Sequence, residues 1–169
     1  MDEKYRTIWE NRLTTIIEGI IIPSYHDPRF NYPDYPLPNI ALDIISKKEY
    51  YDNKKFVDLG TGTGIIPLIL TKHGFDVMGL DSTEISKAGA DYAMELNGIH
   101  YTVLLKDHTY LNEIEYDVLI INQMFYDEEI KKLMHSIAEQ EIAKGKEVLC
   151  FSNRPELLSY PLDALVVQW

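Results

Sequence analysis

Glycine and acidic residues occupy the segment whose spacing points most clearly to ligand chemistry. The run Val57-Asp58-Leu59-Gly60-Thr61-Gly62-Thr63-Gly64 lies where a predicted strand ends and a helix begins. Glycines at such a turn let the backbone approach a ligand that a Cβ atom would hold off, and a helix start offers free N–H groups. Asp81 follows about twenty residues later, at the carboxyl end of the next predicted strand, where an acid can accept both hydroxyls of a ribose. The pattern indicates a ligand that contains a nucleoside.

The spacing of the glycines favours a ligand with an amino-acid part over a dinucleotide. A dinucleotide fingerprint reads G-x-G-x-x-G, whereas Ile65 stands here where its third glycine would be. Asp58 would face a pyrophosphate unfavourably, but it can engage the ammonium of an amino acid. A phosphate loop of the form G-x-x-x-x-G-K-[ST] does not occur in the sequence. A nicotinamide-dependent oxidoreductase is therefore disfavoured.

These residues depend on strands and helices that alternate along the chain. The predicted strands are 56–59, 77–80, 101–105, 117–121 and 147–151, and the predicted helices are 65–73, 84–97 and 127–144. The second of these helices is expected to begin at Ser82-Thr83-Glu84 and the third at Asp127, because both segments offer a cap and an acidic first turn. Strands and helices in this order are typical of a parallel sheet covered on both faces.

The N-terminal region is predicted to be helical at first and irregular afterwards. Apolar residues recur at helical spacing from Tyr5 to Ile20, which predicts an amphipathic helix that ends near Ile22-Pro23. Prolines then alternate with aromatic residues from Pro23 to Pro38, and this density of proline excludes a regular helix or a central strand. A short helix is expected around 40–45.

The composition limits the class of protein. The chain has 169 residues, a formal net charge of −11 and one cysteine, Cys150, which cannot form an internal disulfide. No stretch approaches the roughly 18 to 20 apolar residues of a membrane span, and the first residues are not a signal sequence. We therefore expect a soluble protein of the cytoplasm. The excess of acid and the short basic runs predict no extended nucleic acid partner and no membrane, and we expect no metal site.

The segment V-D-L-G-T-G-T-G, followed by G-L-D ending at Asp81, resembles motifs I and II of the class I S-adenosylmethionine-dependent methyltransferases. Leu105-Lys106-Asp107 is similar to the family's segment after the third strand, and Tyr116 to Tyr126 to its motif IV. The likeness covers roughly residues 40–152. It implies S-adenosylmethionine as cofactor. We expect an α/β fold, Rossmann-like and doubly wound, with a mostly parallel sheet of about six strands and an N-terminal helix. The short segment after the fifth predicted strand departs from the family and predicts a shortened C-terminal edge.

The resemblance also implies a role for each matching residue. Gly60, Gly62 and Gly64 would lie under the methionine part of the cofactor and Asp58 near its ammonium. Asp81 would bind the ribose and Asp107 the amino group of adenine. The predicted cofactor-binding residues are Asp58, Gly60, Thr61, Gly62, Gly64, Asp81, Ser82, Asp107, His108 and Asn122.

Motif IV resembles two groups within the family. As Asn122-x-x-Phe125 it is similar to the N-P-P-[YF] signature of amino methyltransferases, in which the Asn binds an amino group. As Gln123 to Glu128, with Glu95-Leu96-Asn97-Gly98 upstream, it looks more like the protein lysine methyltransferases that include the enzyme acting on the electron transfer flavoprotein beta subunit. That group has an acid where this chain has Gln123. The predicted catalytic residues are Asn122, Gln123 and Tyr126, and further candidates for placing or deprotonating a nucleophile are His26 and His108.

The resemblance leads to a hypothesis of function and organisation. We expect methyl transfer to a nitrogen of a protein side chain or a small amine; the alternative is a non-catalytic module of the same fold that stabilises a partner. Residues 1–169 are predicted to form a single domain, with 1–38 as N-terminal helix and aromatic lid and 39–169 as the cofactor-binding core. Residues 164–169 predict a last strand, and the short sheet edge predicts a homo-oligomer or a partner chain that covers it.

Overall fold

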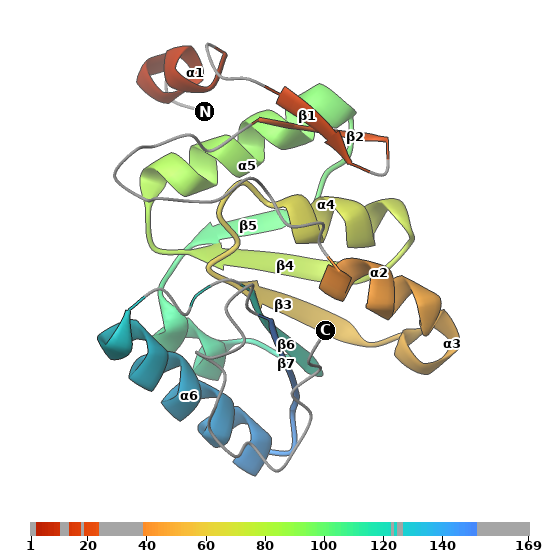
Figure 1. Cartoon of the computed structure of the whole chain (residues 1–169), viewed down its shortest axis with the longest axis vertical. Coiled ribbons are helices and arrows are strands. Elements are labelled where there is room, and N and C mark those ends of the chain that lie inside the picture. The colour runs from red at the N-terminus through yellow and green to blue at the C-terminus, as the bar shows by residue number, and fades with distance from the viewer. Residues whose placement is uncertain are drawn as a thin grey trace.

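A parallel sheet of five strands forms the centre of the molecule (Figure 1). The computed structural model describes residues 3–10, 14–17, 19–23, 39–122, 124 and 127–151. The strands are β3 Lys55–Leu59, β4 Asp76–Asp81, β5 Thr102–Leu105, β6 Val118–Asn122 and β7 Glu147–Phe151, in the order β5-β4-β3-β6-β7. The α/β fold predicted from the sequence is confirmed. The predicted last strand, 164–169, lies outside the described residues.

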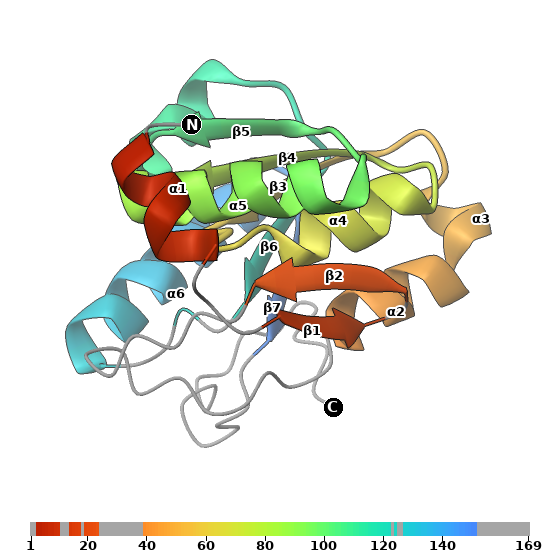
Figure 2. The same cartoon turned by 90° about the horizontal axis from the view of Figure 1, so that it is seen from above.

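The two faces of the sheet are covered by different helices (Figures 1 and 2). Successive side chains of a strand point to opposite faces, so Phe56 and Val57 of β3 belong to two separate buried clusters. The cluster around Phe56 includes α2 Asn39–Ser46, α3 Lys48–Tyr51, α4 Ile65–Lys72 and α5 Glu84–Asn97, and the cluster around Val57 includes the 3-10 helix η2 His108–Glu113 and α6 Glu128–Ala143. Both faces of the sheet are therefore covered, as is usual for a parallel sheet.

The two long helices begin at the capping residues that the sequence predicts. The Thr83 hydroxyl accepts a hydrogen bond from the Ser86 N–H at the start of α5. The Asp127 carboxylate accepts from the N–H groups of Glu129 and Ile130 at the start of α6. These bonds satisfy N–H groups that have no partner inside the helix, and they fix where the loops before each helix end.

The prediction of a single helix from Tyr5 to Ile20 is wrong. Helix α1, Glu3–Glu10, is followed by an antiparallel hairpin of β1 Thr14–Ile17 and β2 Ile20–Pro23, in which Ile17 pairs with Ile20 across a two-residue loop. Thr and Ile are β-branched and favour strands, and Gly19 supplies a φ of +69° in the loop. The isoleucines of this region fit a helical period and a hairpin equally well, so their spacing alone did not decide between them.

The N-terminal elements pack on α5 (Figure 2). Trp9 of α1 is fully buried, donates its indole N–H to the Ile85 carbonyl at 3.2 Å, and lies against Gly89, where an added Cβ would come within 2.5 Å of its ring. Asn97 accepts from the Ile21 N–H and donates to the Ile21 carbonyl, both at 2.7 Å. The predicted aromatic lid, with His26, lies outside the described residues. Among the helices of the described segments, none combines the length and the apolar character needed to span a bilayer.

Candidate functional site

The carboxyl ends of three strands meet where the strand order changes direction. β3 pairs with β4 on one side and with β6 on the other, so the chain moves from β3 toward one edge of the sheet and from β6 toward the opposite edge. Ligands of open parallel sheets bind in the crevice beyond the carboxyl ends at this point. The glycine turn follows β3, Asp81 ends β4 and Asn122 ends β6. The fold therefore brings these three predicted parts of the site together.

Residues 60–64 form a turn that offers open backbone. A Cβ added to Gly62, which has a φ of +56°, would meet no atom within 4 Å. Gly64 is the N-cap of α4 and has a φ of +73°, and a Cβ added there would come within 1.6 Å of the Tyr101 hydroxyl. No side chain caps α4, so its first N–H groups are free to face a ligand. Tyr101 was not predicted as a site residue, and only its packing on Gly64 reveals its place beneath the turn.

Asp81 joins the turn to the start of α5. Its Oδ2 accepts from the Gly62 N–H at 3.0 Å, and its Oδ1 accepts from the N–H and the hydroxyl of Thr83, both at 2.9 Å. Each carboxylate oxygen has two lone pairs, so Oδ1 is filled by Thr83 and Oδ2 can accept one further hydroxyl. Asp81 is 8% exposed, and its neighbour Ser82 is exposed. The carboxylate is thus held rigidly by groups that leave acceptor capacity for a ribose.

Asp58 lies beneath the turn, in the middle of the sheet. It is 2% exposed, and its Oδ2 accepts the Thr61 hydroxyl at 2.8 Å. The Thr61 side chain fits there because Gly79, opposite Asp58 on β4, has no Cβ; one added there would come within 2.9 Å of Thr61. Burial raises the pKa of Asp58 to about 7, the Thr61 hydrogen bond lowers it, and the charge of Asp81 adds to the rise. A cation that reached this carboxyl would stabilise its charged form.

Asp107 and His108 follow the carboxyl end of β5 and begin η2. The Lys106 N–H donates to the Asp81 carbonyl at 2.9 Å, which holds the end of β5 beside the end of β4. Asp107 is exposed and caps η2, with its Oδ1 accepting the N–H and the hydroxyl of Thr109. These hydrogen bonds from Thr109 hold the pKa of Asp107 below its ordinary value. His108 is half-buried as the first residue of η2.

Asn122 is the predicted catalytic residue that the structure describes. It follows Ile121, which pairs with Leu59, and it is therefore opposite the glycine turn. Met124 lies directly against this turn, because a Cβ added to Gly60 would come within 2.3 Å of its sulfur. Met124 was not predicted as a site residue. Gln123 and Tyr126, the other two predicted catalytic residues, lie outside the described residues, as does Phe125.

Comparison with known proteins identifies the fold. No family model matches the chain. The ribosomal protein L11 methyltransferase of Brevibacillus brevis is 26% identical over 117 residues, or 69% of this chain and 37% of that protein. The 23S rRNA (uracil(747)-C(5))-methyltransferase of Pyrococcus horikoshii is 26% identical over 136 residues, or 80% of this chain and 31% of that protein. The solved structure of a SAM-dependent methyltransferase from Agrobacterium tumefaciens matches with a TM-score of 0.56 and 15% identity, over 66% of this chain and 39% of that one.

The chain has the class I S-adenosylmethionine-dependent methyltransferase fold. The predicted fold is confirmed by this likeness. The curated relatives are methyltransferases, which supports the predictions of a methyltransferase and of S-adenosylmethionine as its cofactor. The narrower resemblance to protein lysine methyltransferases is not shown by them. The chain spans about a third of the length of the curated relatives that it matches, at 37% and 31%.

One prediction about partners of this methyltransferase fold is wrong. The excess of acidic residues had excluded extended nucleic acid, yet one relative is a methyltransferase of 23S rRNA. Net charge is summed over the whole chain, whereas an acceptor contacts only the surface around the crevice. The sum of charges therefore does not decide which class of macromolecule reaches the site.

Proposed function

We propose that this chain binds S-adenosylmethionine at the crevice between β3 and β6 and transfers a methyl group to nitrogen. The sulfonium of the cofactor supplies an activated methyl group when it is bound. The chain's part is to hold the reacting groups in line, which is the main demand of such a displacement. The observation that carries this proposal is the Asp81 carboxylate, fixed by Gly62 and Thr83 beside the open backbone of Gly62.

The residues of the crevice fit the parts of this cofactor. Asp58 supplies a buried carboxyl that gains charge beside an ammonium. Asp81 retains a lone pair on Oδ2 for a ribose hydroxyl, and Asp107 is a charged acceptor for the adenine amino group. Gly62 leaves room for the methionine part to approach the backbone. We assign Gly60, Thr61, Gly64, Ser82 and His108 to the walls of the same site.

Nitrogen is favoured over a pyrimidine carbon as the acceptor atom. The C5 position of uracil becomes nucleophilic only after a nucleophile adds to the ring, and the strongest one at neutral pH is a thiolate. The single cysteine, Cys150, is 2% exposed in β7, and burial raises the pKa of its thiol to about 12. It therefore stays protonated and out of reach of a substrate. An amine needs no such addition, since its own lone pair attacks the methyl group.

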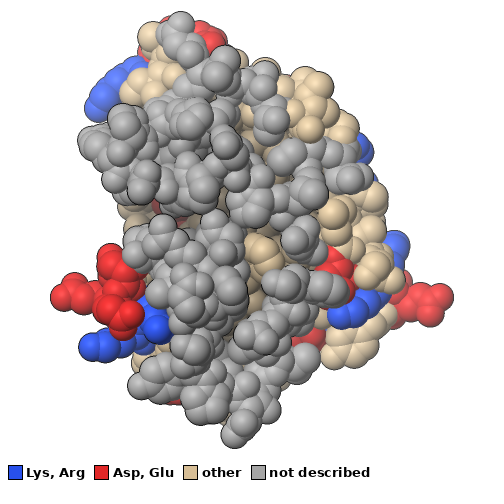
Figure 3. Space-filling view, viewed as in Figure 1, with Lys and Arg blue, Asp and Glu red and all other residues tan. Residues whose placement is uncertain are grey.

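A protein amine is the acceptor that the surroundings of Asn122 support best. The Asn122 amide can accept an N–H of the amine and so direct its lone pair into the crevice. Acidic side chains gather at the start of α6, the helix that follows motif IV (Figure 3). They are Asp127, Glu128 and Glu129, all exposed. Their charge attracts a lysine-bearing surface.

The residues shared with the protein lysine methyltransferases hold the N-terminal elements in this chain. Asn97 bonds the backbone of β2, and Glu95 receives two hydrogen bonds from Arg6 of α1, at 3.0 and 2.9 Å. We propose that α1 and the β1–β2 hairpin, held in this way, contribute to selection of the acceptor, and that Gln123 and Tyr126 complete the acceptor side of the crevice.

Methyl transfer to fractionated cell extract tests the proposal. The pure protein is incubated with S-adenosylmethionine labelled in its methyl group, and the label is followed after digestion with protease or ribonuclease. We expect label in a protein fraction, stable to ribonuclease and reduced at least tenfold with Asn122→Ala. Gln140→Ala, which removes an exposed amide from α6, is the matched control and should keep full transfer. Label in RNA would replace the protein acceptor by a base amine, and no label in any fraction would favour a non-catalytic binding module.

A further inference from the structure

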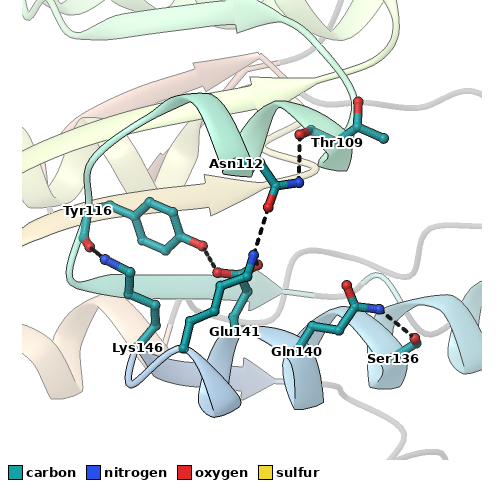
Figure 4. Close-up of polar contacts among 8 residues, drawn as sticks. Thr109, Asn112, Tyr116, Ser136, Gln140, Glu141 and Lys146 are labelled. Atoms are coloured by element: carbon teal, nitrogen blue, oxygen red, sulfur yellow. Dashed lines mark hydrogen bonds and ion pairs between the residues drawn. The ribbon is translucent and has the colours of Figure 1, made fainter.

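A series of polar contacts links η2 to the end of α6 (Figure 4). Thr109 donates its N–H and hydroxyl to Asp107, and its carbonyl accepts from the Asn112 side chain at 3.2 Å. The Asn112 amide oxygen in turn accepts from the Lys144 ammonium at 2.8 Å. Lys144 also donates to Glu141 at 2.6 Å. The contacts therefore run without a break from the end of β5 to the end of α6, in the order Asp107, Thr109, Asn112, Lys144 and Glu141.

A buried carboxylate anchors the far end of this series of contacts. Glu141 is 4% exposed and accepts from the Lys144 ammonium with one oxygen and from the Tyr116 hydroxyl with the other. Tyr116 is itself buried, and its carbonyl accepts from Lys146. A buried carboxylate with two partners has one orientation, because every other orientation leaves its charge unpaired. Lys144 is therefore fixed at its α6 end and reaches across to η2.

The 3-10 helix η2 needs such an anchor. It has six residues, His108–Glu113, and only Leu111 among them is buried. Short 3-10 helices have poor internal hydrogen-bond geometry, so contacts with neighbouring elements decide their orientation. Asp107 is the N-cap of η2, and one of its oxygens is committed to Thr109. A rotation of η2 would therefore change the direction of the other oxygen of Asp107.

We propose that Glu141, Lys144 and Asn112 are positioning residues that set the preference of the site for an adenine base. They act through Asp107 and do not touch the cofactor themselves. The proposal rests on the function proposed above, since it presumes a cofactor with an adenine at this edge. If the Asp107 carboxylate is already held in place before the ligand binds, binding does not have to supply the entropy cost of ordering it. The gain applies only to a base that donates a hydrogen bond to Asp107.

The test compares two ligands that differ only in the base. Binding of S-adenosylhomocysteine and of S-inosylhomocysteine, whose base has a carbonyl in place of the 6-amino group, is measured by calorimetry. The wild-type protein should prefer the adenine ligand, and Asp107→Asn should abolish the preference. Lys144→Met should reduce the ratio of the two affinities about fivefold, the effect of one ordinary hydrogen bond. Lys144→Arg, which keeps a donor, should restore most of it.

Two further variants separate positioning from general stability. Asn112→Asp keeps an oxygen for Lys144 but loses the N–H that bonds the Thr109 carbonyl, so it should also lower the ratio. Lys132→Met, on an exposed position of α6, is the matched control and should leave the ratio unchanged. In the Asp107→Asn background, Lys144→Met should have no further effect on the ratio of the two affinities, because the Asp107 carboxylate through which Lys144 acts is no longer present.

The outcomes distinguish failure of this inference from failure of the proposed function. If Lys144→Met weakens both ligands equally and leaves the ratio unchanged, the contacts only stabilise the fold and the inference is overturned. The same holds if Lys144→Met changes the ratio equally in both backgrounds. If the wild-type protein binds neither ligand, the proposed function itself fails.

Discussion

Lowering the pH from 7 to 5.5 is expected to weaken the binding of S-adenosylhomocysteine about 16-fold through Asp58. This carboxyl is 2% exposed, and burial raises its pKa from an ordinary value of 3.8 to about 7. In the ligand-free protein it is about half protonated at pH 7 and almost fully protonated at pH 5.5. An ammonium pairs with the charged carboxylate alone, so the protonated population must lose its proton to bind.

The magnitude follows from the fraction of protein that carries the charged carboxylate. This fraction is about one half at pH 7 and about one in 33 at pH 5.5, and their ratio is about 16. Stability of the ligand-free protein changes in the opposite direction. Because the pKa is raised on folding, from 3.8 to about 7, the Asp58 contribution is fully present below pH 3.8 and is lost as the pH rises through 7. A shift of that size corresponds to roughly 4 kcal/mol.

Calorimetric titrations between pH 5.5 and 7 at constant ionic strength measure the affinity, and urea unfolding of the ligand-free protein measures the stability. Asp58→Asn should remove the pH dependence of both. Asp76→Asn changes an exposed carboxyl at the opposite end of β4 and should leave both as in the wild type. An affinity that is constant over this range, or one that falls equally in Asp58→Asn, would refute the assignment of Asp58 to the ammonium.

Three substitutions extend the account to the rest of the molecule. Asp81→Ala should weaken cofactor binding about 100-fold, since hydrogen bonds to a charged group are lost together with the anchor of the Gly62 N–H; calorimetry measures this, with circular dichroism as control for folding, and wild-type affinity would contradict the ribose assignment. Asn122→Ala should leave the affinity for the cofactor unchanged and lower turnover at least tenfold. Weaker cofactor binding with unchanged turnover would count against the place of Asn122 on the side of the methyl acceptor. Trp9→Ala should lower the free energy of unfolding by about 3 to 5 kcal/mol, because it empties the contact between α1 and Gly89; Trp9→Phe should lose less, and equal losses would show that ring packing is not the cause.

The sequence was enough to predict the sheet and the site residues beside the glycine turn. The strands and the capped helices follow from apolar runs and from local cap residues such as Thr83 and Asp127, which act over a few positions. Asp58 and Asp81 were found for the same reason, since each lies beside the glycine turn or at the end of a predicted strand. Each of these features depends on residues within a few positions of one another in the sequence, so the sequence alone is enough to predict it.

The parts that sequence reasoning missed depend on contacts between distant segments. Helix η2 has no apolar period to reveal it, and the Thr and Ile run that forms β1 and β2 fits two periods. Glu141 and Lys144 resemble any charged pair on a helix surface, and only the fold shows that Glu141 is buried against Tyr116. The exclusion of nucleic acid failed because a charge sum carries no information about place.

Calorimetry of the wild-type protein with S-adenosylhomocysteine and, in parallel, with NAD tests the central claim most directly. The account predicts saturable binding of one S-adenosylhomocysteine per chain and no binding of NAD, because Asp58 lies beneath the turn where a pyrophosphate would have to approach. Binding of NAD with no binding of S-adenosylhomocysteine would contradict it.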